Sequence, residues 1–244
     1  MRNIIKLYIL MMTIFILLIK GNTHSEIKYY SNPHVLKFQE TNDNTEIGDY
    51  QLSIVDDKLI INAKNKEFEV SLPDNYSNIQ SFHLSYDKRF LAYDVAVESG
   101  IKIFVVNLES GEMINLSDTI GYQSDYDGYQ SPFGIAWAPN KNLIAFICGN
   151  YGAARIDMYH FEMAESMQAT HASEVFENED VYGVKWDSTG GSIYYLIDYK
   201  IINMYKLYQT EIRLPNNYLY AGTIRVITEK KGINNWLNKE DRKE

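Results

Sequence analysis

Residues 135–146 read IAWAPNKNLIAF and carry the strongest signal for the fold. Trp137 closes a short apolar strand, and the turn formers Pro139, Asn140 and Lys141 then reverse the chain. A second apolar, aromatic-containing strand follows directly. The stretch therefore predicts a β-hairpin with a large apolar residue at the end of its first strand.

Two other segments align with this hairpin without gaps. They are residues 82–93, FHLSYDKRFLAY, and residues 184–195, VKWDSTGGSIYY. Leu84, Trp137 and Trp186 correspond in the alignment, 53 and then 49 residues apart. A self-similar unit of about 50 residues is the mark of a repeat architecture.

More strands follow the first hairpin. Residues 101–107 read as a third strand, residues 109–112 as a turn, and residues 113–116 as a short outer strand. Four strands in roughly 50 residues make one blade of a β-propeller. We therefore predict an all-β fold, a β-propeller-like array of about four four-stranded blades, small or incomplete.

The pattern resembles the TolB-like β-propeller repeat of the WD-like superfamily. In that repeat a strand ends in Ser-Pro-Asp-Gly and an Ile-Ala-Phe-like strand follows. The best matches are SYDK (85–88) with LAY (91–93), and APNK (138–141) with IAF (144–146). The resemblance covers about residues 80 to 210 and concerns the fold, because propellers host both binding and catalytic roles.

The two ends of the chain fit the repeat less well. Residues 34–72 hold four strand-like stretches, at 34–38, 50–55, 59–62 and 68–72, which predict a diverged first blade. Residues 219–228 read as a final strand, and ring closure against that blade is one arrangement for it. A closed ring, an open arc and part of a multi-chain assembly all remain open.

The first 25 residues read as a secretory signal peptide. Arg2 and Lys6 form a positive start, the apolar run 7–19 follows, and Thr23 and Ser25 are the small residues of a cleavage site. The run has 13 residues and spans about 20 Å as a helix, less than the roughly 30 Å of a bilayer core. We predict cleavage, with an uncleaved anchor as the alternative, and a secreted or cell-envelope location. The domain prediction is a signal peptide at 1–25, a propeller domain at 26–229 and a polar tail at 230–244.

Charge and cysteine content narrow the function classes. The net charge is −9, and removing Arg2, Lys6 and Lys20 with the leader lowers it to −12. A surface this acidic repels phosphate backbones, so we expect no nucleic-acid partner. The single cysteine, Cys148, cannot form an internal disulfide, and it reads as a small buried strand residue.

The sequence contains no convincing motif for catalysis or for metal binding. No Gly-x-Ser-x-Gly elbow occurs, and the histidines are too scattered for a metal site. Calcium is the one candidate cofactor, because Asp125 and Asp127 begin an oxygen-rich Asp-x-Asp-Gly loop. A solvated acidic turn is the favoured explanation, so we expect no cofactor. Paired acids, such as Asp56 with Asp57, would suit glycoside chemistry only if they were held across a sugar site. We therefore predict no catalytic and no metal residues.

One loop has a composition typical of recognition surfaces. Residues 121–130, GYQSDYDGYQ, place tyrosines among Gln, Asp and Gly in a blade-connecting loop. A Tyr-rich turn that packs on its neighbours is the plain alternative. The predicted binding residues are Tyr122, Asp125, Tyr126, Asp127 and Tyr129.

The sequence thus favours an exported, non-catalytic binding or scaffold protein, with a protein or an envelope component as its partner. Two alternatives stay open: an extracytoplasmic enzyme acting on glycans, and a sensor domain that residues 7–19 hold at the membrane. Partner, ligand and oligomeric state are not encoded in any motif.

Overall fold

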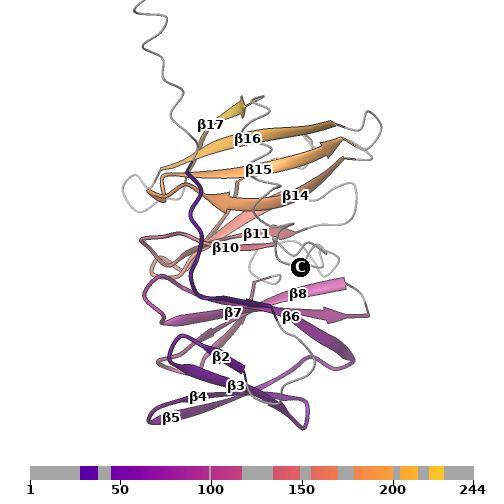
Figure 1. Cartoon of the computed structure of the whole chain (residues 1–244), viewed down its shortest axis with the longest axis vertical. Helices are drawn as coiled ribbons and strands as arrows, with labels where there is room; N and C mark the ends of the chain where they lie inside the picture. Colours follow the sequence, from indigo (N-terminus) through magenta and orange to yellow (C-terminus); the bar gives the residue numbers. More distant parts are fainter. Residues whose placement is uncertain are drawn as a thin grey trace, which may run out of the picture.

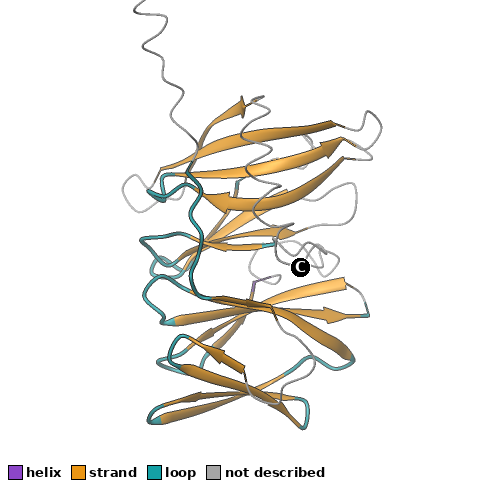
Figure 2. Cartoon of the chain, in the orientation of Figure 1, coloured by secondary structure: helices purple, strands orange, loops and turns teal. Residues whose placement is uncertain are grey.

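A computed structural model describes most of the chain after the leader, and strands dominate it (Figure 2). It contains seventeen β-strands in its described part. The described residues are 28–37, 45–98, 100–116, 134–148, 155–169, 179–199, 204–213 and 220–227.

The strands form four antiparallel sheets, each a meander of consecutive strands. The first sheet contains β2 (Thr45–Ile47), β3 (Tyr50–Val55), β4 (Lys58–Ala63) and β5 (Lys66–Ser71). The second contains β6 (Tyr76–Leu84), β7 (Phe90–Val97), β8 (Gly100–Asn107) and β9 (Met113–Asn115), with β1 (Val35–Lys37) beside β6. The third contains β10 (Ile135–Trp137), β11 (Leu143–Cys148), β12 (Arg155–His160) and β13 (Glu165–Gln168). The fourth contains β14 (Glu179–Trp186), β15 (Ser192–Tyr199), β16 (Met204–Arg213) and β17 (Tyr220–Ile227).

The sheets stack face to face along the long axis of the molecule (Figure 1). The first and fourth sheets lie at opposite ends of this axis, so the described sheets form an open array. Each of the three aligned segments forms the first hairpin of its sheet, β6–β7, β10–β11 and β14–β15. The predicted all-β, propeller-like array of four four-stranded blades is confirmed.

Two predicted strands at the ends of the chain do form, but each pairs elsewhere than with the first sheet. β1 does not belong to the first sheet, because Val35, Leu36 and Lys37 pair with His83, Phe82 and Ser81 of β6. Residues 220–227 do not close a ring, because β17 pairs with β16 and completes the fourth sheet. In both cases the sequence shows a strand but not its pairing partner.

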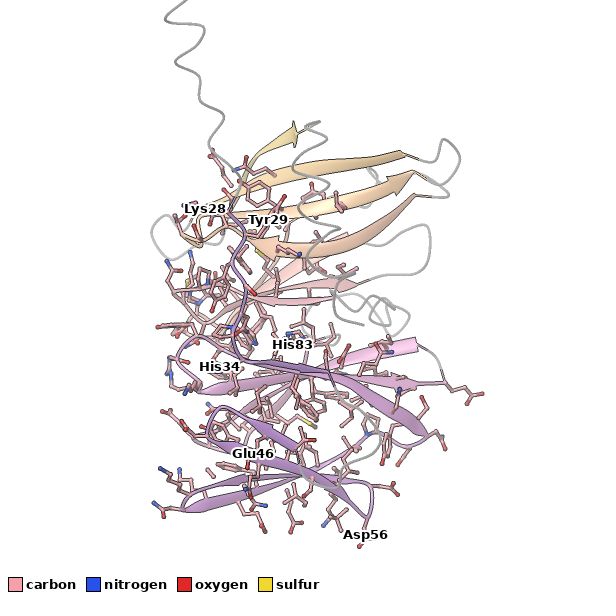
Figure 3. All side chains as sticks on the ribbon, viewed as in Figure 1. Lys28, Tyr29, His34, Glu46, Asp56 and His83 are labelled. Atoms are coloured by element: carbon pink, nitrogen blue, oxygen red, sulfur yellow. The ribbon has the colours of Figure 1, made fainter. Side chains whose placement is uncertain are left out.

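An extended segment, residues 28–37, which we name the strap, runs from the fourth sheet to the second (Figure 1). At one end Tyr30 N donates to Trp186 O at 2.8 Å, and Ser188 N donates to Lys28 O at 3.1 Å. At the other end Leu84 N donates to His34 O at 3.0 Å. The strap therefore joins two sheets that are not neighbours in the array, as the labelled side chains of Figure 3 show.

Each neighbouring pair of sheets buries a shared apolar layer. Leu59, Phe82 and Leu84 belong to the layer between the first and second sheets. Phe90 and Trp137 belong to the layer between the second and third. A layer that includes Trp186 joins the third to the fourth. Successive side chains of a strand point to opposite faces of the sheet. Because a middle sheet packs on a neighbour at each face, both sets of its side chains contribute to an apolar layer.

The outer face of the first sheet is different. Leu52, Leu59 and Val70 point into the array and are buried, whereas the alternate positions on β5, Glu67 and Glu69, are exposed. Lys58 Nζ pairs with Glu69 Oε2 at 2.8 Å on this face. A polar outer face is how a repeat array ends in solvent, so this sheet caps the array.

The repeated tryptophans fix how one sheet sits on the next. Trp137 Nε1 donates to His83 O at 3.0 Å, and Trp186 Nε1 donates to Ala136 O at 2.9 Å. In both cases the acceptor is the residue just before the equivalent repeat position, Leu84 or Trp137, in the preceding sheet. Both indoles are almost fully buried. The same bond therefore sets the offset between sheets two and three and between sheets three and four.

We predict that Trp137→Phe and Trp186→Phe each lower the free energy of unfolding by about 2 kcal/mol. Each change removes the indole donor and leaves a buried carbonyl unpaired, and it also removes ring volume. Urea unfolding followed by circular dichroism measures the effect. Tyr86→Phe, at an exposed position, is the control and should change stability by less than about 0.5 kcal/mol. Wild-type stability in both tryptophan variants would contradict the role of these bonds.

Candidate functional site

The array has two unlike edges. Because consecutive strands run in opposite directions, the turn after the first strand and the turn after the third strand of every sheet lie on one edge, which we name the turn edge. The other connections, including residues 117–133 between β9 and β10, start and end on the opposite edge, the loop edge. The short turns appear in teal on the left of Figure 2.

Polar contacts link the turns of all four sheets along the turn edge. Tyr50 Oη donates to Lys88 O at 3.3 Å, which joins the first sheet to the second. Asn142 Nδ2 donates to Asp87 Oδ2 at 2.8 Å, which joins the second to the third. Asn140 Nδ2 donates to Thr189 O at 2.8 Å, which joins the third to the fourth. The polar turn residues of the repeat thus bind the neighbouring turn.

The densest of these contacts is the turn junction, which we define as Asp87, Arg89, Asn142, His160 and Glu162. Arg89 Nε donates to Asp87 Oδ2 at 2.5 Å, and an Arg89 terminal nitrogen donates to Glu162 Oε1 at 2.8 Å. Asn142 Nδ2 reaches the same Glu162 oxygen at 2.6 Å. His160 Nδ1 lies 3.4 Å from Glu162 Oε2. Two carboxylates and one guanidinium therefore meet around one buried amide.

The hydrogen bonds and the burial in the turn junction determine the protonation states of its side chains. Burial opposes the charged form of Asp87, but hydrogen bonds from Asn142, Arg89 and Ser85 outweigh it and lower its pKa. The hydrogen bond to Asp87 raises the pKa of Arg89. Burial lowers the pKa of His160, against the attraction of Glu162. The junction therefore holds an ionised acid–arginine pair beside a neutral imidazole.

A second polar cluster lies deeper in the same interface, toward the loop edge. Ser81 and His83 are on β6 and Asp94 is on β7, and all three are buried. The register of β6 shifts between Ile79 and Ser81, which marks a β-bulge. Ser81 N and Ser81 Oγ both donate to Asp94 Oδ1 at 2.7 Å. Asp94 therefore binds the backbone amide at the bulge.

This cluster is not a catalytic relay, although it contains Ser, His and Asp. Ser81 Oγ lies 2.8 Å from His83 Nε2, and its proton is donated to Asp94. In an acyl-transfer relay the histidine stands between serine and acid and takes the serine proton. Here the serine stands in the middle, and its hydroxyl is buried. The arrangement stabilises the bulge and holds two ionisable groups away from water.

Burial changes the proton affinity of both ionisable groups in the cluster. It lowers the pKa of His83 to about 4, so the ring is neutral at pH 7. It raises the pKa of Asp94, even though the two bonds from Ser81 favour the carboxylate. Both shifts have the same physical cause, the removal of water from a charge.

The interface between the second and third sheets collects most of the buried polar side chains in the described residues. Asp157 of β12 joins them, because strand alternation places it on the same face as Tyr159, which packs in this interface. The apolar layers of the other two interfaces hold no buried charged residue among the described positions. The polar set at this interface is Ser81, His83, Asp94, Asn142 and Asp157. His160 pairs with Leu143 and shares its face, toward the fourth sheet.

The binding residues predicted from sequence fall outside the described part of the chain. Tyr122, Asp125, Tyr126, Asp127 and Tyr129 all belong to residues 117–133, as does the calcium-type loop. Their flanking positions, Leu116 and Gly134, are described and buried, and Leu116 belongs to the apolar layer between the second and third sheets. The predicted site therefore stays a prediction about the loop edge.

The structure gives local roles to other residues that the sequence analysis weighed. Asp56 and Asp57 form the two-residue turn between β3 and β4, with φ of 48° and 60°, rather than a catalytic pair. His83 and His160 lie in different sheets, and His160 shares the face of its register partner Leu143, toward the fourth sheet. No group of three or more potential metal-ligating side chains occurs within the described ranges. Only pairing across β6 and β7 brings Ser81, His83 and Asp94 together, and no spacing in the sequence indicated it.

Comparison with known proteins finds only distant structural similarity. No family model matches the chain, and no curated protein sequence matches it. TolB from Acinetobacter baumannii is 15% identical with a TM-score of 0.43, over 71% of this chain and 38% of that one. An oligogalacturonate lyase in complex with manganese is 13% identical with a TM-score of 0.43, over 77% and 55%. A prolyl endopeptidase is 11% identical with a TM-score of 0.45, over 83% and 29%.

The chain spans less than two thirds of each of these three proteins. The predicted TolB-like β-propeller fold is confirmed by the four meander sheets, and a TolB structure is among the matches. At such identities the matches concern the fold alone. Within the described ranges, no helix is long and apolar enough to cross a bilayer.

We predict that acid weakens the fold through His83. Its pKa is about 4 in the folded state against 6.5 for an ordinary histidine, so the unfolded chain binds more protons in this window. The free energy of unfolding is then at its full value above pH 6.5 and falls by roughly 3 kcal/mol as the pH drops to 4. Urea unfolding at a series of pH values measures the slope.

The variant His83→Gln tests the origin of this slope. Glutamine keeps a donor for Ser81 Oγ but does not titrate, so the dependence between pH 6.5 and pH 4 should become shallower. An unchanged profile in a folded His83→Gln protein would assign the acid sensitivity to other groups.

Proposed function

We propose that this chain is an exported, non-catalytic binding or scaffold protein whose partner is a protein or a component of the cell envelope. The observation that carries the proposal is the use of the polar side chains in the second–third interface. Ser81 donates to Asp94, and Asp87, Arg89, Asn142 and Glu162 bind one another. These groups join strands and sheets to each other, which is the chemistry of a rigid scaffold.

The proposed binding face is the loop edge. The described turns at the turn edge are short, and their polar side chains bind the turns of neighbouring sheets. The Asp87–Asn142 and Asn140–Thr189 bonds are examples. The loop edge carries the longer connections, including residues 117–133 with their tyrosines. Rigid sheets that hold long loops at one edge are a common design for recognition. The proposed contact residues are Tyr122, Asp125, Tyr126, Asp127 and Tyr129.

An extracytoplasmic location is part of the proposal. It rests on the leader-like residues 1–25, and it makes residues 26–229 the folded body and residues 230–244 a polar tail. The strap begins at Lys28 in the described part, two residues beyond the proposed cleavage point, and is already bonded to the fourth sheet.

We predict that the exported protein begins at Glu26. N-terminal sequencing of the protein from its native envelope or culture fluid provides the measurement. An intact Met1 on membrane-associated protein would contradict cleavage and favour the anchored sensor.

We predict that one partner is captured by the loop edge. The exported chain is crosslinked in its own envelope and culture fluid, and bound proteins are identified by mass spectrometry. Replacing Tyr126 and Tyr129 together by Ala should reduce the captured partner at least about tenfold, because aromatic anchors carry much of the energy of such surfaces.

Tyr86→Ala is the matched control for this capture. Tyr86 is 44% exposed and lies on the turn edge, so its loss should leave the capture unchanged. Equal loss from both variants would argue against a loop-edge face. A blank capture with turnover of an envelope glycan would replace the binding proposal with the enzyme alternative.

A further inference from the structure

The outer face of the fourth sheet is buried, although this sheet ends the array (Figure 1). Ile193 and Tyr195 of β15 belong to the layer shared with the third sheet, so Tyr194 and Leu196 lie on the opposite face. Tyr194 is 8% exposed and Leu196 is 0% exposed. Neither belongs to any of the three apolar layers between the sheets. Something other than a neighbouring sheet therefore covers these two side chains.

The first sheet, at the other end of the array, has an outer face that is open to solvent. Glu67 and Glu69 of β5 lie on that face and are exposed. Polar side chains of this kind need no cover at the end of a repeat array. Leu196 is different, because a fully buried side chain is surrounded by several others.

The strap meets the outer face of the fourth sheet at Tyr194. The rings of Tyr29 and Tyr194 meet edge to face, with their centroids 5.4 Å apart, and Lys185 Nζ lies 5.7 Å from the Tyr29 ring. Leu196 lies two residues farther along β15, about 7 Å toward the loop edge. Its register partner on β14 is Gly183, which has no side chain to cover it. The place beside Leu196 is therefore open to a side chain from another segment.

The chain leaves the fourth sheet in the same row as Leu196. Leu196 pairs with Leu207 of β16, and Leu207 pairs with Ile227, the last residue of β17. Adjacent strands are about 4.8 Å apart, so the chain leaves the sheet about 10 Å from Leu196. Residues 228–244, which we name the C-terminal segment, follow directly. Ten residues of helix span about 15 Å, which is enough to return across β16 to β15.

The apolar residues of the C-terminal segment have the spacing that such a contact needs. Its large apolar side chains are Ile233, Trp236 and Leu237, and polar or charged residues surround them in the sequence. The i, i+3, i+4 spacing places all three on one face of a helix. Left in solvent, this face would expose hydrocarbon to water, and packing on Tyr194 and Leu196 removes that exposure.

We propose that the C-terminal segment folds back over the outer face of the fourth sheet and docks there as an amphipathic helix. Its Ile, Trp and Leu side chains then pack on Tyr194 and Leu196. The segment closes this end of the array, as terminal caps do in repeat proteins. This docking goes beyond the proposed binding function, because it concerns the end of the array and not the loop edge.

A double-mutant cycle on the exported chain tests the contact. Leu196→Ala and Trp236→Ala should each lower the urea midpoint of unfolding. The double variant should lose less than the sum of the two shifts, because residues in contact are not additive. Leu59→Ala is the matched control: Leu59 is also 0% exposed, but lies between the first and second sheets, and its shift should add to that of Trp236→Ala. Additive shifts for Leu196→Ala and Trp236→Ala would overturn the proposal.

Acrylamide quenching of tryptophan fluorescence gives a second readout, which decides if Leu196→Ala does not fold. The chain has three tryptophans, and Trp137 and Trp186 are buried. If Trp236 is docked, all three are protected, and Trp236→Phe leaves the quenching constant of the protein unchanged. Strong quenching that Trp236→Phe removes would show an exposed segment and contradict the docking. Protection of Trp236 that is lost on dilution would assign the cover to a second copy of the chain, which also overturns the proposal.

Discussion

The hydrogen bond from a repeat tryptophan to the backbone of the preceding sheet is the contact on which the array depends. Trp137 reaches His83 O and Trp186 reaches Ala136 O, at equivalent positions of successive sheets. A buried indole needs a hydrogen-bond acceptor for its N–H, so each of these bonds restricts where the ring can lie on the preceding sheet. This placement sets the offset between sheets, and the Asp87–Asn142 and Asn140–Thr189 bonds at the turn edge follow from that offset.

The three interfaces that this stacking creates differ in chemistry. In the described residues the first–second and third–fourth layers consist of apolar side chains, with the buried His160 beside the third–fourth layer, and their stability comes from removing hydrocarbon from water. The second–third interface has a polar cluster toward each edge, around Asp94 and around Asn142. Every member needs a partner, because an unpaired polar group is costly at low dielectric. The exact stacking of these two sheets is therefore specified by directional bonds as well as by packing.

The ends of the array explain why it stays open. The outer face of the first sheet carries Lys58 and Glu69, paired with each other, and such a face offers no apolar layer to another sheet. The strap takes a different route and links Trp186 O in the fourth sheet to the edge of β6 in the second. Long-range ties in this fold thus run through an extended backbone segment instead of through ring closure.

The sequence alone determined the parts of this protein that local chemistry controls. Strand–turn–strand units at 82–93, 135–146 and 184–195, their alignment and the all-β class follow from apolar patterning and turn residues, which act over a few positions. The diverged first sheet was also visible as strand-like stretches between residues 50 and 72.

Tertiary structure decided what depends on partners distant in the chain. A strand at 35–37 has the same sequence signal whether it pairs with the first sheet or with β6, because β-pairing is set by backbone bonds that carry no residue code. For the same reason the cluster of Ser81, His83 and Asp94 appears only when β6 and β7 pair around a bulge. The turn junction likewise needs two sheets to meet before Asn142 can bind Asp87 and Arg89 can bind Glu162.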